Sequence, residues 1–151
     1  MNEAAFNAGA AYVFVRDGNG LWSQQAYIKS ANSETRDLFG WSIALGGDTL
    51  LVGATGEASA STGVNSEPGN NDADEAGAAY VFVRSAGLWS QSTYIKPSNT
   101  GAEDQFGIGV AVSGDTLAIG ARAEDSDGIG IDPIPDNDAA DSGAGYVYFR
   151  E

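Results

Sequence analysis

The sequence predicts an all-β protein built from a repeated unit of about 67 residues. Residues 20–54 and 87–121 share 19 identities in 35 positions, where chance would give about two or three. A shorter segment of the form Gly-Ala-x-Tyr-Val-x-x-Arg begins at Gly9, Gly77 and Gly143. No stretch shows a sustained helical period with capping residues, so we predict no helix.

The strands follow one another in the same order in each repeat. Residues 10–16 and 80–83 are rich in β-branched and aromatic side chains, and a glycine turn leads from each into a second strand, over 21–29 and 88–96. A Phe-Gly pair then opens a third strand, and Gly-Asp-Thr marks a tight turn into a fourth. With a last strand near 145–149, the chain has nine predicted strands, in sets of two, four and three.

The strand over 106–112 has two unlike faces. One face is smooth and the other is bulky: Gly107, Gly109 and Ala111 alternate with Ile108, Val110 and Val112. The earlier copy has the same pattern, with Gly40, Ser42 and Ala44 opposite Trp41, Ile43 and Leu45. Such a strand suits a place where sheets converge, and the innermost strand of a propeller blade is such a place. The alternative is a strand in an ordinary sandwich.

The ordered motifs resemble those of a known family. Phe39-Gly40 and Phe106-Gly107, then Val52-Gly-Ala54 and Ile119-Gly-Ala121, then Ala79-Tyr-Val-Phe82, resemble the FG-GAP repeat of integrin α-subunits and of many bacterial surface and secreted proteins. The resemblance, to the bacterial form in particular, implies a β-propeller of four-stranded antiparallel blades. It implies that the Phe-Gly strand is innermost and the Trp-Ser-Gln strand outermost. It also implies an extracellular or cell-surface parent protein.

The calcium loop of the integrin-type repeat does not carry over to this chain. Its place is held by the short turns 46–49 and 113–116, with one carboxylate each. The third motif element also departs from the family pattern, because Gly-Ala-Pro has become Gly53-Ala-Thr55 and Gly120-Ala-Arg122.

Carboxylates gather instead in two long loops, residues 55–76 and 122–142, which hold 12 of the 21 acidic residues. Such clusters repel themselves unless a cation or an arginine neutralises them, and calcium accepts carboxylate, amide and main-chain oxygens. The loops are therefore candidate sites for Ca²⁺; the alternative is a solvated loop that confers only solubility. The candidate ligands are Glu124, Asp125, Asp127, Asp132, Asp136, Asp138, Glu57 and Asn65. The first loop is expected to bind more weakly, because Ala58 stands where the second has Asp125.

The aromatic residues repeat with the period, which is typical of packing positions. We interpret Trp22 and Trp89 as anchors of the outer strand on the next blade; the alternative is a platform for sugar stacking. Trp41, Tyr12, Tyr80 and Tyr146 are expected to pack between blades for the same reason.

Composition excludes several function classes. Seven basic and 21 acidic residues give a formal charge of −14, which argues against binding to nucleic acid or anionic lipid. The absence of His and Cys removes the usual general base, the thiol nucleophile, structural zinc sites and disulfides. No apolar run approaches the ~20 residues that span a bilayer. The N-terminus has no signal-peptide pattern, so we expect the chain to be a trimmed or engineered piece of any exported parent.

We predict that the chain is not an enzyme. A serine nucleophile would need a lysine base, and Lys29 and Lys96 occupy equivalent repeat positions without a Ser-x-x-Lys motif. A hydrolase using a carboxylate pair is the remaining catalytic alternative, but nothing singles out one pair among the 21 acids.

We interpret residues 1–151 as a single propeller fragment, with approximate repeats 10–76 and 77–142 and an extra strand at 143–150. About two blades cannot surround an axis, because propellers need roughly four to eight. We therefore predict a homo-oligomeric ring completed by strand sharing; a longer parent propeller and an open filament are the alternatives. In the ring, residues 10–16 and 143–150 compete for one place.

These observations favour a non-catalytic, self-assembling module, a structural or protein-interaction scaffold. Its expected partners are further copies of itself and a protein or glycan ligand, without nucleic acid and without membrane insertion. The competing class is a lectin-like carbohydrate-binding module that holds sugar through its acidic loops and aromatic rings.

Overall fold

The computed structural model describes residues 5–131 and 138–150. Within these residues the chain forms nine strands and no helix, and thus no helix that is long and apolar enough to cross a membrane. The strands are β1 (Ala11–Arg16), β2 (Trp22–Ile28), β3 (Phe39–Gly46), β4 (Thr49–Ala54), β5 (Ala78–Ser85), β6 (Leu88–Ile95), β7 (Phe106–Ser113), β8 (Thr116–Ala121) and β9 (Ala144–Phe149).

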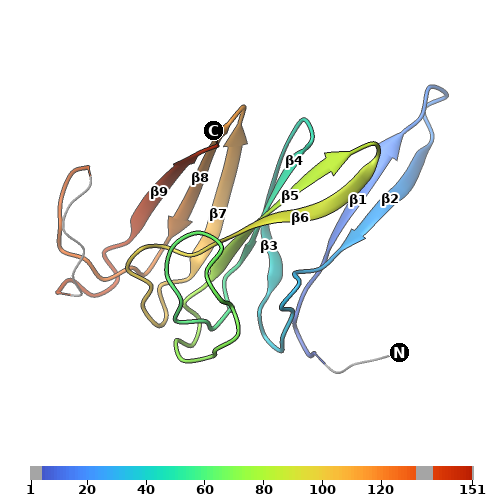
Figure 1. Cartoon of the computed structure of the whole chain (residues 1–151). Coiled ribbons are helices and arrows are strands. Elements are labelled where there is room, and N and C mark those ends of the chain that lie inside the picture. The colour runs from blue at the N-terminus through green and yellow to red at the C-terminus, as the bar shows by residue number, and fades with distance from the viewer. Residues whose placement is uncertain (1–4, 132–137, 151) are drawn as a thin grey trace.

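The strands form three antiparallel sheets, which stand side by side in chain order (Figure 1). Sheet 1 is β1-β2, sheet 2 is β3-β4-β5-β6, and sheet 3 is β7-β8-β9. The predicted all-β class and the grouping of two, four and three strands are confirmed. In sheet 2 the Phe-Gly strand β3 and the Trp-Ser-Gln strand β6 lie at opposite edges, in the order that the repeat predicts for a blade.

Equivalent strands pair in the same register in different sheets. Tyr12 of β1 is opposite Tyr27 of β2, and Tyr80 of β5 is opposite Tyr94 of β6. Each pairing has a bulge at the same position, directly after Val13 in β1 and after Val81 in β5. The sequence repeat therefore fixes the strand register as well as the strand order.

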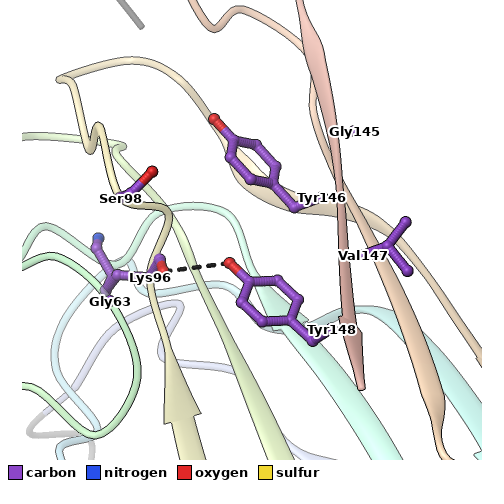
Figure 2. Close-up of a pocket in the computed structure, with 7 residues that line it drawn as sticks. All are labelled: Gly63, Lys96, Ser98, Gly145, Tyr146, Val147 and Tyr148. Carbon is purple, nitrogen blue, oxygen red and sulfur yellow. Dashed lines mark hydrogen bonds between the residues drawn. The ribbon is translucent and has the colours of Figure 1, made fainter. Parts of the chain in front are cut away.

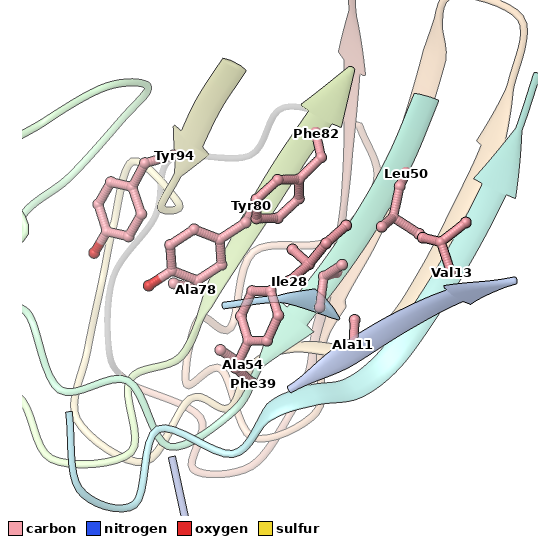
Figure 3. Packing of buried hydrophobic residues seen from close by; sticks show 11 residues of the cluster. Ala11, Val13, Ile28, Phe39, Leu50, Ala54, Ala78, Tyr80, Phe82 and Tyr94 are labelled. Carbon is pink, nitrogen blue, oxygen red and sulfur yellow. The ribbon is translucent and has the colours of Figure 1, made fainter. Parts of the chain in front are cut away.

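The hydrophobic core consists of two joints between neighbouring sheets. Figure 3 shows the first joint, where side chains of sheet 1 pack on one face of sheet 2: Ala11, Val13, Ile28, Phe39, Leu50, Val52, Ala54, Ala78, Tyr80, Phe82 and Tyr94. The second joint packs the other face of sheet 2 on sheet 3: Leu51, Ala79, Val81, Ile95, Phe106, Leu117, Ile119 and Ala121. Most members of one joint have a repeat-equivalent member in the other, so the chain makes the same kind of joint twice.

Unlike faces meet where β3 packs on β7. The partly buried side chains of Ala44, on the smooth face of β3, and of Val110 and Val112, on the bulky face of β7, contact the second core. Ser42 Oγ donates a hydrogen bond to the carbonyl of Gly107 at 2.7 Å. Sheets 2 and 3 therefore converge at β3 and β7, as the two unlike faces of these strands predict, and the structure adds that the small face of one strand meets the bulky face of the other.

The bulky face of β3 itself is exposed, contrary to the expectation that Trp41 packs between blades. Trp41 is 58 % exposed, Ile43 49 % and Leu45 59 %. The reason is that β1 and β2 correspond to the outer strands β5 and β6 of sheet 2. Sheet 1 thus covers Phe39, Leu50 and their neighbours but has no described inner strand to cover Trp41.

Candidate functional site

A buried ion pair joins the end of β6 to the first long loop. Lys96 Nζ lies 2.9 Å from Glu57 Oε2 and donates to the carbonyl of Gly77 at 2.6 Å. Lys96 is 0 % exposed and Glu57 2 %. Burial lowers the pKa of Lys96, and the Glu57 carboxylate opposes this shift. A pair held this deeply is stable only while both partners and their remaining hydrogen bonds are present.

Three further groups complete the site around Glu57. Its Oε1 accepts from Tyr94 Oη at 2.9 Å and from Asn32 Nδ2 at 3.3 Å, and its Oε2 accepts from the backbone N–H of Ser59 at 3.2 Å. The Tyr80 hydroxyl donates to Asn32 Oδ1 at 2.9 Å. Burial, reinforced by the Glu57 charge, raises the pKa of both tyrosines, which keeps both hydroxyls protonated as donors.

A second copy of this site surrounds Glu124, the repeat equivalent of Glu57. Glu124 is 2 % exposed, and its Oε1 accepts from Asn99 Nδ2 and from Ser126 Oγ. The Tyr146 hydroxyl donates to Asn99 Oδ1 at 2.8 Å, as Tyr80 does to Asn32. The backbone agrees too: the N–H of Gly143 donates to the carbonyl of Glu124 at 2.8 Å, the distance found between Gly77 and Glu57.

The second copy lacks its cation. No Lys or Arg in the described part of the chain forms an ion pair with Glu124. In the first site, Tyr94 lies in β6, the outermost strand of sheet 2, and Lys96 follows directly after it. Sheet 3 contains no described fourth strand. Burial raises the pKa of neighbouring Asp104, and the charges of Glu124 and Asp125 add to that rise. Lys96 opposes that rise, but it forms its ion pair with Glu57 and not with Glu124.

The complementary half of the site lies at the other end of the molecule. Lys29 is the repeat equivalent of Lys96, and its Nζ donates to the carbonyl of Gly9 at 2.7 Å, as Lys96 does to Gly77. Within residues 5–131 and 138–150, no carboxylate lies within ion-pair distance of Lys29.

Strand β9 borders a pocket of about 260 Å³. Four consecutive residues of β9, Gly145 to Tyr148, line one side, and Gly63, Lys96 and Ser98 line the other. Figure 2 shows the tyrosine rings of β9 pointing toward Lys96 and Ser98, while Val147 points away. The Tyr148 hydroxyl donates to the carbonyl of Lys96 at 3.3 Å. The pocket therefore lies between β9 and the segment that follows β6, on the side of β9 to which Tyr146 and Tyr148 point.

The far face of sheet 3, which points away from sheet 2, is uncovered among the described residues. Ala118 and Val147 are exposed there, whereas their equivalents in sheet 2, Leu51 and Val81, are buried in the second joint. The same surface is thus packed against a neighbouring sheet in sheet 2 and uncovered in sheet 3. This face is complementary to the exposed bulky face of β3, because a smooth face and a bulky face already pack together where β3 meets β7.

The candidate calcium ligands are divided between different surroundings. Glu57 faces Lys96, while Asn65 accepts from the backbone N–H of Tyr94 at 3.0 Å and holds the first loop on the edge of β6. In the second loop, Glu124 is buried, Asp125 Oδ1 accepts from the N–H of Asp141 at 2.8 Å, and Asp127 and Asp138 are exposed. Asp132 and Asp136 lie outside the described residues. Among the described residues, no group of three or more acidic side chains is close enough to hold a metal ion.

The short turns between β3 and β4 and between β7 and β8 each hold an aspartate that pairs with an arginine. Arg84 Nε lies 2.6 Å from Asp48 Oδ1, and Arg150 Nη2 lies 3.1 Å from Asp115 Oδ1. Both pairs are partly exposed, so each contributes about 1 kcal/mol or less. The sequence had not indicated these pairs.

The two equivalent tryptophans have different surroundings. Trp89 packs against the first joint, donates from Nε1 to Gln25 Oε1 of sheet 1 at 2.9 Å, and lies under the Arg84 guanidinium at 5.5 Å. It is the inter-sheet anchor that the sequence predicts. Trp22 is 68 % exposed, because no described sheet lies on its side of sheet 1. Tyr12 is exposed for the same reason, whereas Tyr80 is buried and Tyr146 packs against the second joint.

A family model for the FG-GAP repeat matches the chain twice, over residues 22–82 and 89–148. The two matches cover most of the chain and begin at the two equivalent tryptophan positions. Among curated proteins, none matches the chain at a significant level.

Proposed function

The chain belongs to the FG-GAP repeat family, and on that premise we propose that it is a non-catalytic β-propeller module that assembles with copies of itself into an interaction scaffold. FG-GAP repeats build β-propeller-like protein-interaction modules and are typical of extracellular proteins. One observation carries the proposal: the far face of sheet 3 and the bulky face of β3 in sheet 2 are both uncovered, and they are the two kinds of surface that pack together inside the molecule. Exposed apolar faces and open strand edges are typical of interfaces between proteins.

The proposed assembly is head to tail. The far face of sheet 3 of one copy would pack on the bulky face of β3 in sheet 2 of the next, as sheet 2 packs on sheet 3 within one chain. This is a heterologous interface, which closes into a ring when the rotation between copies adds up to a full turn. Each copy supplies about two blades, so a ring of roughly four to eight blades takes about two to four copies.

The mass of the chain in native solution tests this proposal. We expect light scattering at micromolar concentration to give a multiple of 15.5 kDa. Each copy has a formal charge of −14, so salt should strengthen the association by screening the repulsion between copies. A well-folded monomer at every salt concentration would contradict self-assembly.

Calcium binding by the second loop stays a prediction from the sequence and is part of the proposal. The first loop already has Lys96 beside Glu57. In the second loop Arg122 is the one basic residue among seven acids, and its Nη2 is bonded to Gln105. We therefore expect millimolar calcium to raise the melting temperature and a chelator to reverse the change. Asp125→Asn should weaken the effect, while Asp72→Asn in the first loop serves as the control. An unchanged melting curve in millimolar calcium would remove this part of the proposal.

A further inference from the structure

We propose, resting on the proposed self-assembly, that Lys29 and Tyr27 of a second copy of this chain complete the buried carboxylate site of Glu124. The contact would rebuild between two molecules the site that Lys96, Tyr94 and Glu57 form within one. Each copy would then offer a lysine half-site at one end and a glutamate half-site at the other.

The glutamate half-site is built in all parts except the two side chains that a fourth strand supplies. Glu124 is held by Asn99 and Ser126 as Glu57 is held by Asn32 and the backbone of Ser59. What it lacks, relative to Glu57, is a lysine Nζ at about hydrogen-bond distance and a tyrosine hydroxyl. A buried carboxylate without a cation is costly, and a well-placed lysine from a partner would remove that cost.

The lysine half-site is equally incomplete. Lys29 makes the carbonyl contact of its equivalent, 2.7 Å to Gly9 compared with 2.6 Å from Lys96 to Gly77. The carboxylate contact is what it lacks within the described residues. Tyr27 is 56 % exposed, whereas its equivalent Tyr94 is 5 % exposed and bonded to Glu57.

Strand register brings these two halves together. β2 pairs with β1 as β6 pairs with β5, with Tyr27 opposite Tyr12 and a bulge at the same step. β9 carries the same sequence pattern as β1 and β5, and it is the edge strand of sheet 3 among the described residues. When β2 of a second copy takes the fourth place in sheet 3, Lys29 falls beside Glu124, and Tyr27 falls opposite Tyr146 if β9 keeps the third place or stays opposite Tyr12 if β1 takes it.

The third place in the completed sheet is filled either by β9 or by the incoming β1, because the two have equivalent sequences. The predicted competition between these segments therefore has no effect on the ion pair. Lys29 needs a glycine carbonyl and a carboxylate, and either Gly143 or Gly9 supplies the carbonyl. The carboxylate is Glu124 in both arrangements.

Three forms of the chain test the inference: wild type, Lys29→Met and Glu124→Gln. Methionine keeps most of the lysine stem, and glutamine still accepts from Asn99 and Ser126, so both variants should fold. Removing one partner of a buried pair typically weakens association by roughly 100-fold or more. We expect each variant alone to be monomeric at concentrations where the wild type assembles, as measured by native mass spectrometry. Circular dichroism melting confirms that each variant is folded.

Mixing the two variants provides the decisive control. A Glu124→Gln copy still has Lys29, and a Lys29→Met copy still has Glu124, so a mixture can form one native joint. With one variant labelled with ¹⁵N, we expect mixed pairs of copies and no further growth. Variants that assemble as the wild type does, or a mixture that forms no mixed pairs, would overturn the inference and leave self-assembly standing. A wild type that is monomeric would overturn both.

Discussion

Replacing Lys96 with methionine is expected to destabilise the chain by about 3–5 kcal/mol, because it leaves the Glu57 carboxylate buried without its cation. Lys96 is 0 % exposed and contacts both Glu57 and the carbonyl of Gly77. Methionine retains the length and the apolar stem of the side chain, so the loss reports the missing charge rather than a cavity. Urea unfolding followed by tryptophan fluorescence measures the change in the free energy of unfolding.

The matched control is the double variant Lys96→Met with Glu57→Gln. Removing the second charge takes away the unpaired carboxylate while Asn32 and Tyr94 keep a polar partner. We expect the double variant to regain most of the lost stability, because two neutral groups in this site cost less than one unpaired charge. A loss below about 1 kcal/mol in the single variant, or no recovery in the double one, would show that the pair does not stabilise the joint between the loop and β6.

The substitution Gly53→Ala is expected to cost about 3 kcal/mol, because it forces sheet 2 and sheet 3 apart. A Cβ at Gly53 would lie 2.0 Å from the carbonyl oxygen of Gly107 and 2.5 Å from Ser42 Oγ. Serine could rotate away, but the Gly107 oxygen belongs to the backbone of the neighbouring sheet. Thermal and urea unfolding of the purified variant check the prediction.

Gly120 is the repeat equivalent of Gly53 and supplies the control. A Cβ there would meet nothing nearer than Ile108 Cγ2 at 3.7 Å, because the far face of sheet 3 is open. Gly120→Ala should therefore change the stability of the single chain by no more than about 0.5 kcal/mol. It should nevertheless weaken self-assembly, since the proposed joint would place another sheet against this face. Equal stability losses at the two glycines would contradict this account of the sheet-to-sheet joint.

The strands could be predicted from the sequence because their signals are local. Alternating side chains, glycine turns and the offset of 67 residues identify nine strands and their order without any knowledge of distant contacts. The alternation of small and bulky residues in each Phe-Gly strand also indicated that sheets converge there. The exposure of Trp41 could not be predicted in this way, because a packing pattern in the sequence does not say whether a covering strand is present.

The role of Glu57 was not predicted, because it depends on where a long loop runs. The acid count of the loop indicated a metal ligand, whereas the structure pairs this carboxylate with Lys96, which is 39 residues away. A signal was nevertheless present in the sequence. Each repeat places a lysine directly after an outer strand and a glutamate shortly after an inner one. In a protein with few basic residues, oppositely charged residues that recur at such positions are candidates for a buried ion pair.

The pairing of a smooth face with a bulky one has a consequence for how such chains grow over evolutionary time. A unit that carries both halves of its own joint can be duplicated in tandem without the invention of a new contact, because every added unit meets its predecessor as the predecessor met the one before. Lengthening the gene and gathering separate chains are then two routes to the same architecture. The choice between them depends only on whether a peptide bond happens to join one unit to the next.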